Sequence, residues 1–224
     1  MFSEFFGQIG TFDSVRVTII MSLASTVIAS VLGITAGLWL ERHRFPGKRF
    51  IIRLNRTLMG MPSVVVGLIT YMLLMRRGPL GFLNWLFTIQ GMVVAQVIII
   101  TPIICGMVFT HADRIAPAIR MFAKNMGASS RQTNRLILRE MRNEMYFAVV
   151  MGFGRSISEV GAVLMVGGNI KNSTRTMTTA ISTLKSAGVF TDGIVLGVIL
   201  LVIAFVIQTV ADRLRKQVSY DENY

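Results

Sequence analysis

The sequence is short of charged residues. Asp, Glu, Lys and Arg make up 15% of the 224 residues, whereas a typical soluble domain has about 25%. The chain has one cysteine and two histidines, so it can form no internal disulfide and we expect no metal site. It also lacks a Gly-x-x-x-x-Gly-Lys-Ser/Thr phosphate-binding loop, which excludes an ATPase site of that type in this chain.

Long apolar stretches dominate what is present. Five of them, with few or no charges, are each long enough to cross the ~30 Å hydrocarbon layer as a helix, at 17–40, 57–75, 91–110, 145–168 and 193–211. Because these stretches are uninterrupted, they exclude a β-barrel, in which apolar and polar residues alternate along strands of ~10 residues. The 53% hydrophobic content excludes disorder. The sequence therefore predicts an all-α polytopic membrane protein, with residues 1–224 forming a single transmembrane domain.

Local signals refine the ends of these spans. Pro62 removes a backbone donor and should bend or unwind the first turns of the second span. The spacing of phenylalanines in 1–13 favours a short helix on the membrane surface. Since no basic region precedes 17–40 and no convincing cleavage site is present, we expect a retained first span rather than a signal peptide.

The distribution of positive charges predicts the orientation of the chain in the membrane. With an odd number of spans the termini lie on opposite faces, and an outside N-terminus puts sixteen Lys and Arg residues on the cytoplasmic side and six outside. The cytoplasmic ones fall in a loop at 41–56, a longer loop at 112–144 and the C-terminal tail. This placement explains the net charge of +12 without nucleic acid, for which no recognition module is present.

Two charges, Arg155 and Glu159, lie one helical turn apart within the fourth span. An unpaired charge facing lipid would cost about 2.5 to 3.5 kcal/mol at the bilayer centre, so both should face the protein interior. They could form a pathway or gate, or a structural ion pair. The segment after this span is rich in Ser, Thr and Asn, which could pass a tetrahedral dianion or form an ordinary solvated loop.

The cytoplasmic segment 112–144 carries a motif centred on a glycine. It reads Ala123-Lys124-Asn125-Met126-Gly127-Ala128-Ser129-Ser130-Arg131-Gln132-Thr133, with Ile137 following. A glycine lets two short helices approach closely and turn sharply, in a docking loop or in an ordinary helix-loop-helix. The motif resembles the signature loop of ABC importer permeases, although Met121 and Phe122 replace the usual Glu and Ala. The resemblance assigns ATPase coupling to Ala123, Met126, Gly127, Ala128, Ser129, Gln132, Thr133 and Ile137.

A second motif surrounds the intramembrane charges. The stretches Ser158-Glu159-Val160-Gly161-Ala162, Gly167-Gly168-Asn169 and Met177-Thr178-Thr179-Ala180-Ile181 are similar to the oxyanion branch of those permeases, most of all to tungstate permeases. The resemblance implies a type I importer permease fold with the N-terminus outside and the C-terminus cytoplasmic. It also implies a translocation pathway or gate that includes Arg155, Ser158, Glu159, Gly168, Asn169, Thr174 and Thr176.

The resemblance further implies the surroundings of the chain. We expect a multi-pass protein of a prokaryotic cell membrane that moves tungstate inward, with molybdate or sulfate as alternatives. The expected partners are a second copy of the chain, two cytoplasmic ATPase subunits and an external oxyanion-binding protein. The chain itself would hold no cofactor, since ATP and Mg belong to the ATPase.

Two rival classes can be weighed from the residues. An intramembrane enzyme would use Ser156 or Ser158 as nucleophile, but His43 and His111 both lie outside the predicted spans, so a buried Ser-His pair is hard to build. A passive membrane anchor would need neither charges within a span nor a helical cytoplasmic docking loop.

Overall fold

The computed structural model describes residues 11–221, and this part of the chain is helical without a strand. The expected surface helix over 1–13 therefore lies largely outside the described residues. The helices are α2 (Thr11–Arg42), α3 (Lys48–Met59), α4 (Ser63–Leu74), the 3₁₀ turn η1 (Gly81–Leu83), α5 (Ile89–Asn125), α6 (Ser130–Glu140), α7 (Arg142–Ile157), α8 (Gly161–Gly167), α9 (Met177–Ser186) and α10 (Phe190–Asp221).

Three helices, α2, α5 and α10, are long and apolar enough to cross a membrane. They contain the predicted spans 17–40, 91–110 and 193–211. Two further spans are possible only if helices are joined across a bend, α3 with α4 at 103° and α7 with α8 at 58°. By length and composition the described chain thus has three spans, or up to five.

The region around the second predicted span differs most from expectation. We expected a basic loop at 41–56 and one helix at 57–75, but residues Lys48–Met59 form α3 and a new helix begins at Ser63. Gly60 ends α3, and Pro62 has an extended backbone with φ −60° and ψ 126°. Proline lacks the N–H that would continue the helical ladder, so the chain turns through 103° at this point.

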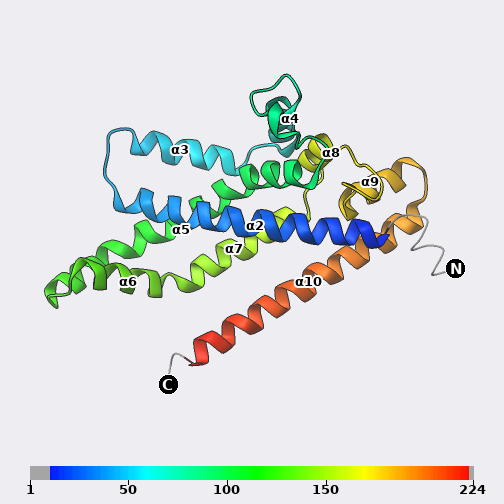
Figure 1. The fold of residues 1–224 in the computed structure, drawn as a ribbon. Coiled ribbons are helices and arrows are strands. Elements are labelled where there is room, and N and C mark those ends of the chain that lie inside the picture. Colours follow the sequence, from blue (N-terminus) through cyan, green and yellow to red (C-terminus); the bar gives the residue numbers. More distant parts are fainter. Residues whose placement is uncertain (1–10, 222–224) are drawn as a thin grey trace.

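α2 and α5 lie side by side, α10 diverges from them, and most of the short helices gather at the two ends (Figure 1). One end holds the α2–α3 loop and α6, and the other holds α4, α8 and α9. The fourth predicted span, 145–168, consists of α7 and α8 with a break at Ser158–Val160. Residues 169–192, expected as an outward segment, include α9, whose first turn is buried.

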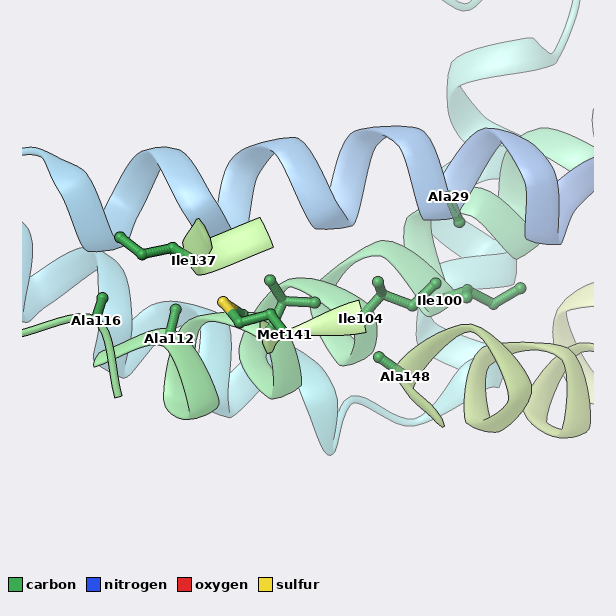
Figure 2. Close-up of a cluster of buried hydrophobic side chains, with 9 residues drawn as sticks. Ala29, Ile100, Ile104, Ala112, Ala116, Ile137, Met141 and Ala148 are labelled. Carbon is green, nitrogen blue, oxygen red and sulfur yellow. The ribbon is translucent and has the colours of Figure 1, made fainter. Parts of the chain in front are cut away.

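Glycines let α2 pack closely on α5. A Cβ on Gly33 would lie 2.8 Å from Ile104 Cβ, and one on Gly37 would lie 2.9 Å from the Cys105 carbonyl oxygen. The core beside this contact joins α2, α5, α6 and α7 through buried alanine, isoleucine, valine and methionine side chains (Figure 2). Cys105 is buried in a neighbouring apolar cluster, where it packs as a small hydrophobic side chain.

An ion pair closes the same bundle at the end of α2. Arg120 of α5 donates two hydrogen bonds to the Glu41 carboxylate, the longer at 2.6 Å. These bonds raise the pKa of the Arg120 guanidinium. Glu41 is nearly buried, and the paired, planar contact fixes the end of α2 against the part of α5 that leads to the coupling motif.

Candidate functional site

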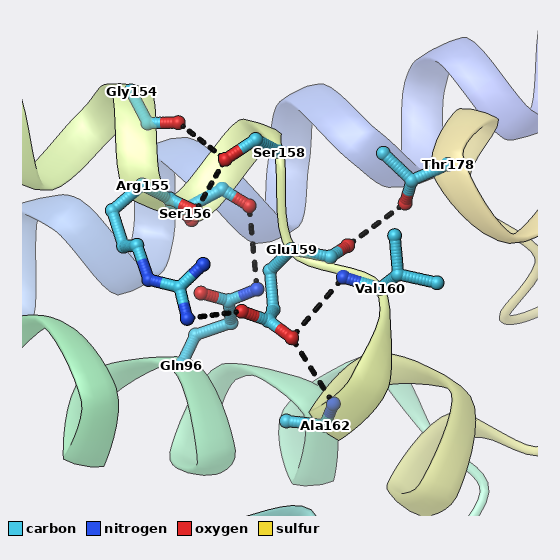
Figure 3. A network of polar contacts seen from close by, with 9 residues as sticks. All are labelled: Gln96, Gly154, Arg155, Ser156, Ser158, Glu159, Val160, Ala162 and Thr178. Atoms are coloured by element: carbon cyan, nitrogen blue, oxygen red, sulfur yellow. Dashed lines mark hydrogen bonds and ion pairs between the residues drawn. The ribbon is translucent and has the colours of Figure 1, made fainter. Parts of the chain in front are cut away.

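The first candidate site is the break between α7 and α8 (Figure 3). Arg155 and Glu159 form the expected pair across one turn, with Nη2 and Oε2 separated by 3.0 Å. The two side chains differ in environment, because Glu159 is 1% exposed and Arg155 is 36% exposed. The carboxylate is therefore interior, while the guanidinium reaches open space.

Glu159 also holds the bend itself. Its Oε1 accepts hydrogen bonds from the backbone N–H groups of Val160 at 3.1 Å and Ala162 at 3.2 Å, where α8 begins. A carboxylate that accepts such bonds satisfies donors that the break leaves free. Oε2 has only the ion pair, without a hydrogen bond of good geometry. Oε1 thus stabilises the backbone at the bend, and Oε2 faces Arg155.

Buried polar side chains connect this break to two other helices. Ser156 Oγ lies 2.9 Å from Ser25 Oγ of α2, and Gln96 of α5 donates to the Ser156 carbonyl at 3.3 Å. Gln96 Oε1 is buried and has no hydrogen-bond partner, and an orphaned acceptor of this kind is costly in a low-dielectric interior. Sequence reasoning missed Gln96, although a lone amide within an apolar run was a visible signal.

α9 docks on the site through Thr178. Its Oγ1 donates to the Glu159 carbonyl at 2.8 Å. The backbone N–H of Met177 donates to Thr18 Oγ1 of α2 at 2.9 Å. The break therefore lies where α2, α5, α7, α8 and α9 meet.

The other predicted pathway residues take part in local structure. Thr174 Oγ1 donates to the Gly167 carbonyl and accepts from Ile170 N, and Thr176 caps α9 in a reciprocal capping box with Thr179. Both threonines are buried. Ser158 Oγ donates back to the Gly154 carbonyl at 2.9 Å. These hydroxyls hydrogen-bond to the backbone, and their place on a pathway stays a prediction.

Gly168 and Asn169 form the turn after α8. Both have positive φ, 69° and 52°, a conformation that glycine and asparagine adopt most readily. Asn169 Nδ2 donates to Thr183 Oγ1 at 2.8 Å, and Arg175 Nε donates to Asn169 Oδ1 at 3.2 Å. The amide therefore ties the turn to α9.

The second candidate site is the coupling turn, residues 126–129, between α5 and α6. Gly127 has φ 71° and lies in a Schellman motif, in which Ala128 N donates to the Ala123 carbonyl at 2.9 Å and Gly127 N to the Lys124 carbonyl. Ser129 then begins α6 in a capping box with Gln132. The sequence therefore ends one helix and starts the next within four residues.

The predicted coupling residues fall into two groups by exposure. Ala123 and Ile137 are buried and fix the turn to the core, while Thr133 Oγ1 donates back to the Ser129 carbonyl. Met126 is 72% exposed, and Met121 and Phe122, one turn earlier on α5, are also exposed. The coupling turn thus presents an apolar surface outward. It lies at the far end of the molecule from the break (Figure 1).

Neither serine of the rival enzyme hypothesis has a histidine partner among the described contacts. Ser156 pairs with Ser25, and Ser158 bonds to its own helix. His43 stacks on Trp39, and His111 lies 3.7 Å from Glu144. A Ser-His nucleophile is therefore not assembled here.

Bent apolar helix pairs, a buried carboxylate at a helix break and an exposed apolar turn between α5 and α6 are typical of a polytopic membrane protein of the transporter kind. The family described as "Binding-protein-dependent transport system inner membrane component" matches residues 16–220, and the chain belongs to it. It is thus the permease subunit of an ABC importer, with the type I permease fold, and an inner-membrane component. Family membership implies an ATPase and a substrate-binding protein as partners.

Relatives cover nearly the whole chain. The "Tungstate uptake system permease protein TupB" of Peptoclostridium acidaminophilum is 38% identical over 89% of this chain and 88% of its own. The protein of the same name from Campylobacter jejuni is 33% identical over 91% of this chain and 85% of its own. A "Probable anion ABC transporter permease protein" of Haloferax volcanii is 36% identical over 89% and 88%.

Proposed function

We propose that this permease imports tungstate. The observation that carries the proposal is the similarity, over nearly the full length, to two permeases named for tungstate uptake. The site supports an anion, because the guanidinium of Arg155 is partly exposed while its carboxylate partner is buried. A partly exposed guanidinium that is already paired with Glu159 attracts an oxyanion without holding it tightly, as a conduit requires.

The test is metal accumulation in cells. Cells with and without this protein receive tungstate, molybdate and sulfate at equal concentrations, and cellular tungsten, molybdenum and sulfur are measured. Tungsten should fall strongly in cells that lack the protein and return when it is restored. A fall in molybdenum or sulfur alone would replace tungstate by that anion, and no change in any of them would contradict oxyanion import.

The proposed assembly has two copies of the chain around a shared pathway, two separate ATPase chains and one external binding protein. ATP bound to the ATPases would close them and draw the two coupling turns together, opening the pathway outward. Hydrolysis would reset it. Such coupling needs contacts that differ between the two states, and the exposed Met121, Phe122 and Met126 offer an apolar surface for the ATPase.

We also propose that the N-terminus is outside. The basic residues support it, because thirteen of the 23 Lys and Arg residues lie in 41–56 and 112–144. The α2–α3 loop and α6, which belong to these two segments, share one end of the bundle (Figure 1). The test uses single cysteines at exposed positions in a Cys105→Ser background, since Thr178 is buried and would report poorly. Ser173→Cys should react with an impermeant thiol reagent in intact cells, and Ser130→Cys only after the membrane is opened. The reverse order would invert the topology.

A further inference from the structure

The helix α3 has three different faces. Ile52 and Asn55 are half-buried against α5, and Asn55 Nδ2 donates to the Pro102 carbonyl at 3.1 Å. On one side of this contact lie Phe50, Ile51 and Leu54, exposed apolar side chains. On the other lies the basic face of α3, which we define as Arg49, Arg53 and Arg56, at positions i, i+4 and i+7 and all exposed.

The basic face lies at the depth of an apolar part of α5. Figure 1 shows α3 running alongside α2 and α5 rather than across them. The contact is close, because a Cβ on Gly106 would lie 2.5 Å from Met59 Sδ. Since Pro102 and Gly106 belong to a stretch of α5 without charge, the second half of α3 stands beside the hydrocarbon-spanning part of α5. An amphipathic helix on the membrane surface would instead lie in the plane of the interface.

The arginines at this depth have no carboxylate partners. Within the described residues none of the three forms an ion pair. An arginine facing lipid costs about 2.5 to 3.5 kcal/mol at the bilayer centre, and intramembrane cations therefore face a water-filled cavity or protein. Because the apolar face of α3 is already available to lipid, the basic face is the one that adjoins water.

Hollows are present along the basic face. Arg49 lines one of about 540 Å³ together with Phe109 and Asp113 of α5. Arg56 lies beside Gly106 and Thr110, and these two residues also border a second hollow of about 310 Å³ that contains His111 and Arg114. Cations of α3 and α5 thus line hollows beside α5, together with the carboxylates of Asp113 and Glu144.

We infer that the basic face of α3 lines a water-filled vestibule at the cytoplasmic end of the pathway, where it binds the oxyanion transiently during release. The inference rests on the proposed function and adds a site to it. Guanidinium groups offer paired N–H donors that match the oxygens of a tetrahedral dianion. Three cations in a low-dielectric cleft also raise the local anion concentration. The phosphate of an anionic lipid has the same chemistry, so the test separates the two sources.

The first experiment locates the basic face and depends on no substrate. In the complete transporter with Cys105→Ser, Arg56→Cys and Leu54→Cys are treated with an anionic thiosulfonate reagent from the cytoplasmic side. Arg56→Cys should react at least about tenfold faster, since the remaining cations attract the reagent and Leu54 faces lipid. Equal rates at the two positions, whether fast or slow, would overturn the vestibule.

The second experiment removes charge with a matched control. Tungstate uptake is measured in proteoliposomes that contain the complete transporter, made with and without phosphatidylglycerol. R53Q/R56Q should lower the initial rate about tenfold in both lipids, in line with the loss of electrostatic focusing. R76Q/R77Q removes the same charge from the exposed segment after α4, away from these hollows, and should transport like the wild type.

The outcomes are distinct. Equal uptake by the two double variants would overturn the proposal, and a loss confined to phosphatidylglycerol vesicles would assign the basic face to lipid phosphate instead. A wild-type transporter that takes up none of tungstate, molybdate and sulfate would defeat the proposed function. In that case the cysteine reaction would still decide where the basic face lies.

Discussion

Gly127→Arg should abolish ATP-driven uptake while ATP hydrolysis and the amount of membrane-inserted protein stay near wild-type values. The sequence suggested close packing at this turn, but nothing in the described chain lies within 4 Å of a Cβ placed on Gly127. A large charged side chain would therefore leave this chain's fold intact and project beside the exposed Met126 into the proposed ATPase surface. Paired measurements of uptake and hydrolysis in proteoliposomes check the expectation.

Gly127→Ala is the matched control for this variant. At φ 71° any side chain strains the backbone by about 1 to 2 kcal/mol, so alanine carries the strain without the bulk and should remain coupled. Arg131→Gln should also do little, because an exposed cation contributes little by itself. Normal uptake by Gly127→Arg would remove the coupling turn from the mechanism.

Arg155→Met should destabilise the protein by about 3 kcal/mol, the magnitude that follows removal of one partner from a buried ion pair. The reason is the burial of Glu159, whose carboxylate cannot reach water once Arg155 is gone. Glu159→Gln should cost less, because Arg155 is 36% exposed and the amide oxygen can still accept from Val160 N and Ala162 N. Unfolding in mixed detergent micelles measures both, with Ser158→Ala as a nearly neutral control.

The double variant Arg155→Met/Glu159→Gln separates structure from transport. Removing both charges relieves the stranded carboxylate, so stability should recover relative to Arg155→Met. If uptake stays absent while stability returns, the pair belongs to the pathway or gate, and if both return the pair only holds the bend. Wild-type stability and uptake in both single variants would show that neither side chain is in a low-dielectric site.

The long helices were predictable, because uncharged runs of about 20 residues have few alternatives to a span. The helix α3 was not predictable in this way. Hydropathy reports only the composition of a window, so a helix with Arg49, Arg53 and Arg56 on one side has the same hydropathy as a basic loop. Pro62 signalled a bend but not its 103°, because the angle depends on the packing of α4 against α8. Ser129 and Gln132 show the opposite case, in which a four-residue spacing alone indicates where α6 begins.

The candidate site was predictable in part for a similar reason. Charges within an apolar run stand out, so Arg155 and Glu159 were found, and their pairing follows from the helical spacing. The capping box of Thr176 and Thr179 has a local spacing that the sequence already contained. The role of Gln96 as a buried bridge depends on Ser156, 60 residues away, and that contact exists only once α5 and α7 are packed.

The ion pair between Glu41 and Arg120 couples movements of α5 to α2. A helix of 37 residues with Pro102 and Pro117 inside it is about 55 Å long, and it runs from the level of the α7–α8 break to the coupling turn. A tilt of about 5° applied at the turn therefore moves the opposite end by about 5 Å. Because Arg120 holds the end of α2 through two hydrogen bonds, α2 moves with α5. A displacement at this turn would thus reach Gln96 of α5 and Ser25 of α2 together, and loss of the Glu41 contact would uncouple α2 from α5.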